Sequence, residues 1–198
     1  MLAHGLALTP ENRKDEGIVP LLGVDENTVL TRFDRVSRGG LLSWTVIADA
    51  ARGIVERMQV KTATLSTPIG TLSGGNQQKV VIGRWLARDC TVLLFDEPTR
   101  GIDVGAKFDI YALMGAQARE GRALVVVSSD LRELMLICDR IGVMSAGRLT
   151  GIFERDNWSQ DALLAAAFAG YAGRDKILGE SIEPGAETPD TPITEHQS

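Results

Sequence analysis

Short apolar runs alternate with longer amphipathic segments along this chain. Residues 6–8 (LAL), 92–95 (VLLF) and 124–127 (LVVV) are continuous apolar runs, which predict strands buried in a core. Residues 44–60, 76–88 and 105–120 place apolar side chains at helical spacing instead. Buried strands that alternate with helices are typical of an α/β fold with a mostly parallel sheet.

The remaining segments are expected to be loops, short helices and one hairpin. Residues 9–17 are polar and predict a loop, and 131–138 predict a short helix. Residues 141–144 and 149–153 flank the sequence SAGR, a hairpin signal. Ser159 is a candidate N-cap for a last helix that stops near Gly170. In the helix over 105–120, Phe108 and Tyr111 are expected on one face together with Met114 or Ala118.

Composition adds limits on function. The 198 residues are 44% hydrophobic and 24% charged, as in an ordinary globular protein. The formal net charge of −5 does not favour a nucleic-acid-binding surface. The sequence contains no apolar run of 18 residues or more, so it predicts no membrane span. Cys90 and Cys138 lie in apolar segments without metal-ligand spacing and are expected to be buried thiols.

A Ser-Gly-Gly turn opens the helix in residues 71–87, TLSGGNQQKVVIGRWLA. The first N–H groups of a helix have no partner within it and carry partial positive charge, which suits phosphate binding. Ser73, Gly74 and Gly75 are therefore candidates for contact with a phosphate.

Two consecutive carboxylates end the apolar run in residues 92–103, VLLFDEPTRGID. Open α/β sheets bind ligands at the carboxyl ends of their strands. Asp96 would hold Mg²⁺ directly or through water, because Mg²⁺ takes one or two carboxylates plus phosphate oxygens. Glu97 would polarise an attacking water as a general base. The alternative is that Asp96 and Glu97 merely end a strand at a solvated loop, and this segment alone does not decide between the two.

The order of these motifs resembles a known family. LSGGNQQ, then DEPT, then GID resembles the ATP-binding cassette ATPases that power transporters. TPENRKDEG, SRGG and VSSDLREL are similar to the second of two tandem cassettes in the ribose/galactose-type sugar importers. The resemblance covers roughly Leu2 to Tyr171. It implies an α/β P-loop-NTPase-like fold, truncated at its N-terminus, with a helical subdomain.

The resemblance also implies roles for individual residues. Asp96 is the Mg²⁺-associated aspartate, Glu97 the catalytic glutamate and Asp103 the D-loop residue. The nucleotide is ATP, and its γ-phosphate is expected to contact the signature residues and the helix start that follows them: Ser73, Gly74, Gly75, Asn76 and Gln77. Glu11 occupies the position of the Q-loop glutamine, and Ser129 that of the switch histidine.

Two departures from the family pattern weaken this cassette's own site. The P-loop string G-x-x-x-x-G-K-[S/T] does not occur in the sequence, and the missing piece is expected to lie N-terminal. Ser129 also cannot shuttle charge as an imidazole does. In the family, each ATP lies between the P-loop of one cassette and the signature of the other. The signature of this chain is therefore expected to act on ATP held by a partner cassette.

The resemblance implies the following organisation. A partial cassette is expected over residues 1–172, with a helical subdomain at about 24–88 and a core at about 89–172, followed by an acidic tail at 173–198. The expected partners are a second cassette, membrane permease subunits and, indirectly, a sugar-binding protein, with the chain peripheral on the cytoplasmic face of the inner membrane. Arg13, Lys14 and Arg38 are expected on a solvated face rather than in contact with the permease.

Other functions stay open. The chain could be a non-catalytic interaction module, or a relic without ATPase activity. An ATPase of the DNA-repair or chromosome-organising type shares the signature and the Asp-Glu strand. That class is disfavoured because the sequence contains no sustained heptads of a long coiled coil.

Overall fold

The computed structural model describes residues 4–32, 36–38, 41–88 and 90–171. The expected acidic tail, Gly39 and Gly40, and the side chain of Arg38 lie outside these residues. The chain divides into two compact units, Met1–Cys138 and Asp139–Ser198. Among the described residues, no helix combines the length and the apolarity that crossing a bilayer requires.

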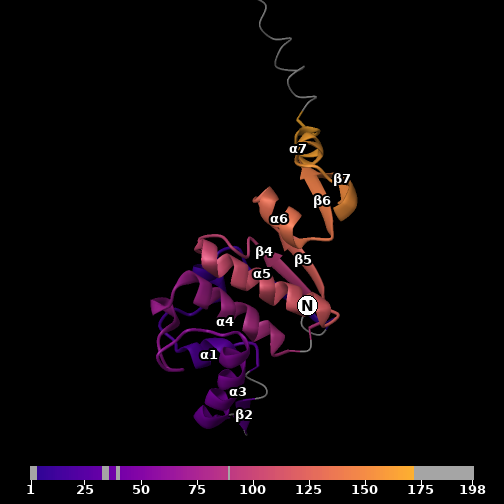
Figure 1. Cartoon of the computed structure of the whole chain (residues 1–198). Coiled ribbons are helices and arrows are strands. Elements are labelled where there is room, and N and C mark those ends of the chain that lie inside the picture. Colours follow the sequence, from indigo (N-terminus) through magenta and orange to yellow (C-terminus); the bar gives the residue numbers. More distant parts are fainter. Residues whose placement is uncertain (1–3, 33–35, 39–40, 89, 172–198) are drawn as a thin grey trace, which may run out of the picture. The chain divides into compact units, whose positions relative to one another are not determined.

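The first unit contains a parallel three-stranded sheet of β1 (Leu6–Thr9), β4 (Val92–Asp96) and β5 (Ala123–Val127). The strand order is β1-β4-β5, so the strand nearest the N-terminus pairs with one more than 80 residues later (Figure 1). All three apolar runs of the sequence are strands, and the predicted α/β class with a parallel sheet is confirmed.

Helices α4 (Gly74–Leu86) and α5 (Val104–Arg119) pack against this sheet. The other helical elements of the unit are η2 (Arg13–Gly17), α1 (Val24–Val29), α3 (Trp44–Arg57), η3 (Ile69–Thr71) and α6 (Leu131–Ile137), with a small hairpin of β2 (Ser37–Arg38) and β3 (Leu41–Leu42). The helices predicted at 44–60, 76–88, 105–120 and 131–138 are confirmed within a few residues. The loop predicted at 9–17 is wrong in part, because η2 forms there. Helix α1 was not predicted, since its six residues are too few to show a helical period.

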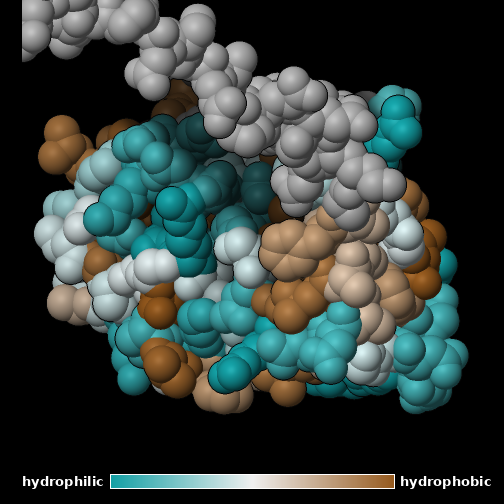
Figure 2. All heavy atoms as spheres, turned by 90° about the horizontal axis from the view of Figure 1, so that it is seen from above, coloured by the Kyte–Doolittle hydropathy of each residue, from teal (hydrophilic) through white to brown (hydrophobic). Residues whose placement is uncertain are grey.

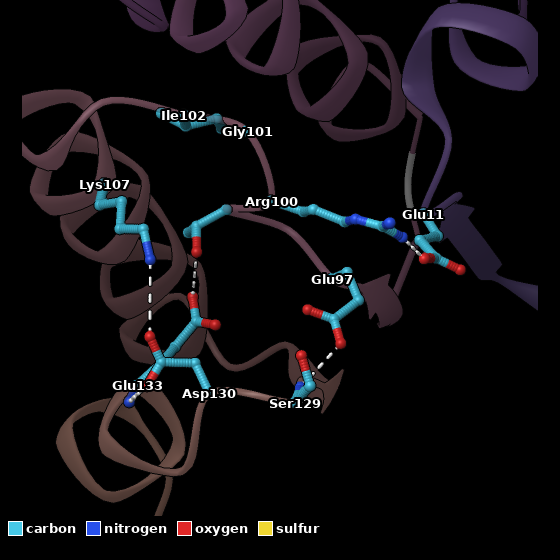
Figure 3. A pocket seen from close by; sticks show the side chains of 10 residues that line it. Glu11, Glu97, Arg100, Gly101, Ile102, Lys107, Ser129, Asp130 and Glu133 are labelled. Carbon is cyan, nitrogen blue, oxygen red and sulfur yellow. Dashed lines mark hydrogen bonds and ion pairs between the residues drawn. The ribbon is translucent and has the colours of Figure 1, made fainter.

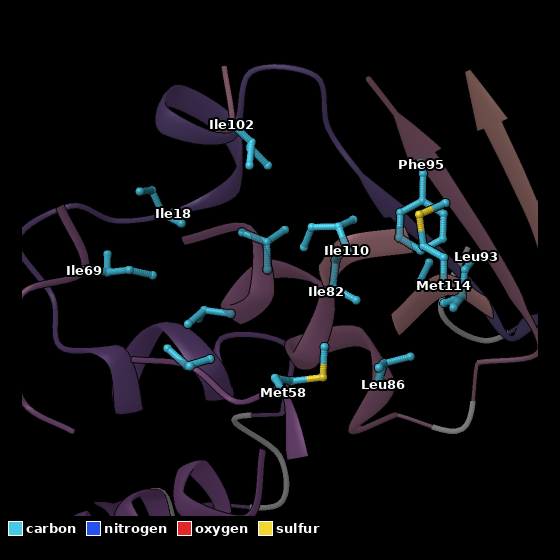
Figure 4. Packing of buried hydrophobic residues seen from close by; sticks show 14 of the residues in the cluster. Ile18, Met58, Ile69, Ile82, Leu86, Leu93, Phe95, Ile102, Ile110 and Met114 are labelled. Carbon is cyan, nitrogen blue, oxygen red and sulfur yellow. The ribbon is translucent and has the colours of Figure 1, made fainter. Parts of the chain in front are cut away.

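The core of the unit lies between the sheet and α4. Helix α4 packs on β1 and on three helices, α1, α3 and α5. Figure 4 shows Ile82 and Leu86 of α4 close to Met58, with Ile110, Met114 and Phe95 in the same cluster. Burial of these side chains supplies most of the free energy that holds the unit together.

The opposite face of the sheet is more open than the sequence predicts. A fully buried strand was expected at 124–127, but Val125 is 50% exposed and Val127 57% exposed. They alternate with partly buried Leu124 and Val126, which pack against the core. Figure 2 shows apolar residues among the hydrophilic ones on the face it presents.

Helix α5 buries only part of the face on which the apolar residues were expected. Its buried residues are Ile110, Met114 and Gln117, whereas Phe108 is 59% exposed and stacks edge-on against Tyr111. The helical period fixes which residues share a face, but the neighbouring elements decide which face is buried. Cys90 is buried as expected, while Cys138 is only partly buried.

The second unit matches the sequence prediction closely. Strands β6 (Arg140–Ser145) and β7 (Arg148–Glu154) form an antiparallel hairpin. Its turn residues Ala146 and Gly147 both have positive φ, which matches the twist of a tight hairpin. After η4 (Arg155–Asn157), the Ser159 hydroxyl accepts a hydrogen bond from the Ala162 N–H and caps α7 (Gln160–Phe168).

Glycine at position 83 lets α3 and α4 approach closely. A Cβ there would lie 2.6 Å from Ile54 Cγ2 and 2.8 Å from Met58 Cγ. We predict that Gly83→Ala lowers the free energy of unfolding by about 1–3 kcal/mol, because the added methyl overfills this contact. Urea denaturation measures the change.

Gly53 of α3 is the matched control, since a Cβ there meets nothing within 4 Å. Gly53→Ala should raise the free energy of unfolding by about 0.5–1 kcal/mol, because alanine favours a helix interior. Equal effects of the two substitutions would contradict the close approach at Gly83.

Candidate functional site

The segments that follow β1, β4 and β5 line an open cavity of about 580 Å³ at the carboxyl edge of the sheet (Figure 3). Acidic side chains dominate its lining, with two cations among them. The lining residues are Glu11, Glu97, Thr99, Arg100, Gly101, Ile102, Lys107, Ser129, Asp130 and Glu133. The strands bring these residues together from segments far apart in the sequence, as parallel sheets do at this edge.

Two hydrogen bonds hold Glu97 in the cavity, one from its backbone N–H and one to its carboxylate. Its backbone N–H donates to Val127 O (2.9 Å), and its Oε1 accepts the Ser129 N–H (2.7 Å). Its φ of +44° is unusual for a residue other than glycine and costs about 1–3 kcal/mol, which the surrounding contacts must offset. The carboxylate therefore has a defined position beside the end of β5.

Asp96 is the last residue of β4 and is partly buried there. Within the part of the chain that the structure describes, no group of three or more His, Cys, Asp or Glu side chains could hold a metal ion. A single carboxylate fits Mg²⁺ only where phosphate oxygens supply further ligands. Asp96 would hold such an ion together with a nucleotide, and the ion would neutralise phosphate charge.

Glu11 reaches the mouth of the same cavity. Its carboxylate forms an ion pair with Arg100, and both side chains are substantially exposed (Figure 3). This contact links the segment after β1 to the loop after β4. The structure thus brings the two carboxylates Glu11 and Glu97 to one cavity.

The Ser-Gly-Gly turn begins α4, with Ser73 as the N-cap. The Ser73 side chain does not cap the helix. The Asn76 amide donates to Ser73 Oγ (2.9 Å), and Asn76 Oδ1 accepts the Lys61 N–H (2.8 Å). Asn76 thereby fixes the exposed serine hydroxyl while leaving the hydroxyl proton for donation to a ligand.

Close packing explains the two glycines of this turn. A Cβ on Gly75 would lie 2.6 Å from Ala106 Cβ at the start of α5. A Cβ on Gly74 would lie 2.5 Å from Arg13 Nη2 and 3.1 Å from Gly101 O. The turn therefore packs against the loop that leads from Glu97 to α5.

Sequence comparisons identify the family. A model of the family "ABC transporter" matches residues 7–100. An uncharacterized ABC transporter ATP-binding protein of Escherichia coli (strain K12) is 52% identical over 154 residues, which are 78% of this chain and 31% of that protein. An arabinose import ATP-binding protein of Chromohalobacter salexigens is 48% identical over 166 residues, 82% of this chain and 33% of that protein. The chain belongs to the ABC transporter family of ATP-binding proteins.

The fold agrees with this family. The chain superposes with a TM-score of 0.63 on the ATP-binding cassette MJ0796 bound to ADP and Pi, at 23% identity, over 77% of this chain and 64% of that one. With a putative metal-chelate type ABC transporter the TM-score is 0.68 at 17% identity, over 83% and 64% of the two chains. At these identities the match supports the fold alone. The chain spans about a third of the length of the sequence relatives named above.

Within the cassette fold, two predicted nucleotide-binding side chains have structural partners. Gln77 is 4% exposed, and its amide donates to Ile69 O (3.2 Å) and Leu72 O (3.1 Å), so it holds the loop before α4 rather than facing a ligand. Asp103 is the N-cap of α5, where its Oδ1 accepts the Ala106 N–H (2.9 Å). Ser129 contacts Glu97 through its backbone, a contact that any side chain at this position allows.

Sequence reasoning missed three residues around the site: Arg13, Thr99 and Glu133. Arg13 was expected on a solvated face, but it is 9% exposed and donates to Arg100 O (2.7 Å) and Gly101 O (3.3 Å). Burial lowers the pKa of the Arg13 guanidinium. A basic residue in a polar stretch gives no local signal of burial, so only the tertiary contacts reveal it. Lys14, in contrast, is exposed as expected.

The N-cap role of Asp103 can be tested directly. We predict that Asp103→Ala lowers the free energy of unfolding by about 0.5–2 kcal/mol, because the Ala106 N–H loses its partner. Asp103→Ser should retain most of the stability, since serine also caps helices. Urea denaturation of the two variants checks this, and equal losses would show that Asp103 does not act as a cap.

Proposed function

We propose that this chain is the signature-bearing part of an ATP-binding cassette in a carbohydrate importer. Its Ser73-Gly74-Gly75 turn completes a site for ATP held by the P-loop of a second cassette. The proposal is carried by the signature turn, in which the exposed Ser73 hydroxyl is held by Asn76, in a sequence without a P-loop string. The similarity to the arabinose import protein supports a carbohydrate as the transported class.

The chemistry of the turn suits this role. The N-terminus of α4 offers N–H groups and partial positive charge to a terminal phosphate. Donors held in place before the reaction stabilise the charge that develops on transferred phosphoryl oxygens. A helix N-terminus contributes only about 0.3–2 kcal/mol to binding a charge, so it completes a site built elsewhere.

The cavity around Glu97 would perform the hydrolysis step. With a nucleotide in this cassette's own site, which is separate from the one that the signature turn completes, Glu97 would accept the proton of the water that attacks the terminal phosphorus, with ADP as the leaving group. Its Oε1 is occupied by the Ser129 N–H, which leaves the other carboxylate oxygen for the proton. Asp96 would hold Mg²⁺ against the phosphates, where the ion would neutralise their charge.

The proposal extends to partners and location. Residues 24–88 would form the helical subdomain that faces the permease, with the remaining core at 89–172. The cassette would be peripheral on the cytoplasmic face of the inner membrane and work with permease subunits and a sugar-binding protein.

A non-catalytic interaction module is the second candidate. It is favoured by the absence of a P-loop string from the sequence, together with the serine at the position of the switch histidine. In that case the chain would bind the partner cassette without supporting hydrolysis.

Calorimetric titration with Mg-ATP tests the chain alone, with Glu97→Gln included so that slow hydrolysis does not hide binding. We expect no saturable binding up to millimolar ATP, because the backbone N–H groups and the lysine with which a P-loop binds the phosphates are missing. Micromolar binding would contradict the proposal.

Mixing the chain with a P-loop-bearing cassette of the same family tests the composite site. We expect ATP hydrolysis in the mixture, lowered at least about 10-fold by Ser73→Ala because one phosphate donor is lost. Ser66→Ala, another exposed serine, is the control and should leave the rate unchanged. Complex formation without any ATP hydrolysis would favour the interaction module.

A further inference from the structure

We propose that Glu133 is a positioning residue of the Glu97 site. Its buried carboxylate joins the loop after β4 to the loop after β5, and so sets where the Ser129 N–H meets Glu97. The functional meaning rests on the proposed role of Glu97, but the test below does not require nucleotide.

Glu133 holds one loop with each carboxylate oxygen. It is 3% exposed; the Thr99 hydroxyl donates to its Oε1 (2.8 Å), and the Ser128 hydroxyl donates to its Oε2 (2.6 Å). Thr99 is also buried. Hydrogen bonds to a charged acceptor are stronger than neutral ones, and a buried carboxylate requires them.

Both donors stand next to the residues that form the Glu97 contact. Thr99 lies two residues after Glu97, and Ser128 immediately precedes Ser129. The contacts therefore close a ring, from Glu133 through Thr99 to Glu97, then across the 2.7 Å hydrogen bond to Ser129 and through Ser128 back to Glu133. Part of this ring is buried at Glu133, while the Ser129 side is exposed.

Neighbouring elements fix the position of Glu133 itself. Its N–H donates to Asp130, the N-cap of α6 (3.3 Å), and the Asp130 N–H donates to Ser128 Oγ (3.1 Å). Lys107 of α5 lies 3.6 Å from the Asp130 carboxylate. Burial, and then the charge of Glu133, raise the pKa of Tyr111 on α5.

This geometry distinguishes positioning from catalysis. Both Glu133 oxygens accept hydrogen bonds, and the side chain is almost fully buried, so it does not present an oxygen to a substrate. Glu97, in contrast, is only partly buried. Glu133 would act on the reaction only through the placement of Glu97 and Ser129.

The test measures the chemical shift of the Ser129 backbone amide proton by NMR in the full chain. Glu97→Gln calibrates the signal: losing the charged acceptor should shift the amide proton upfield. We expect Glu133→Ala to change the chemical shift of this proton in the same direction by a comparable amount. The chemical shift of the Ile110 amide in the core should not change. In the double variant, the two shifts should be clearly less than additive, because both changes act on one contact.

Variants that remove a single hydrogen bond replace Glu133→Ala if that variant does not fold. Thr99→Val and Ser128→Ala each remove one donor, and each should give part of the shift. Glu133→Gln should restore part of it relative to alanine, since its amide oxygen still accepts one hydroxyl. Glu16→Gln, at an exposed glutamate of η2, is the matched control and should leave the Ser129 amide unchanged.

An unchanged Ser129 amide in folded Glu133→Gln, Thr99→Val and Ser128→Ala would overturn the positioning role, as would strict additivity with Glu97→Gln. Failure of the proposed function has a different signature. The Ser129 amide would still respond to Glu133 substitution, while mixtures with a P-loop cassette would show no ATP hydrolysis.

Discussion

Burial of α4 is the constraint on which the first unit depends. Ten of its 13 residues are buried, and Val80, Val81 and Ile82 in succession are inaccessible to solvent or nearly so. A helix buried on consecutive residues has no solvent stripe, so elements must pack around it on several sides. The sheet strand β1 and the helices α1, α3 and α5 do so. Because the signature turn is the first turn of this helix, the core also fixes its position.

Such a helix must find partners for its polar residues. Lys79 is buried and forms an ion pair with Asp109 of α5 at 2.8 Å. Arg84 donates to Asn27 O (2.7 Å) and Gly17 O (2.8 Å), which ties α4 to α1 and η2, and burial lowers its pKa to about 10. These contacts offset the cost of desolvating charge and give the helix one orientation among its neighbours. The same fixed helix then places Gly74 and Gly75 against the loop that follows Glu97.

The loop at 100–103 connects the two functional parts of the cassette. Arg13 donates to its carbonyls at Arg100 and Gly101, and Asp103 ends it by capping α5. One side of this loop lines the cavity of Glu97, and Gly101 O approaches the signature turn. Glu133 adds a buried link between the loops after β4 and β5. The acidic cavity and the signature turn are thus parts of one packed framework rather than independent motifs.

The sequence alone determined the strands β1, β4 and β5, the long helices, the hairpin at 141–153 and the order of motifs that indicates the family. These features depend on residues close together in the chain, where periodicity and turn chemistry act directly. Only the tertiary structure decided that Arg13 is buried, that Phe108 is exposed, that Gln77 holds a loop and that Glu133 meets Thr99 across 34 residues. Each of these depends on which elements meet in space. A local pattern assigns residues to a common face of a helix or strand, but the partner that covers this face comes from distant parts of the chain.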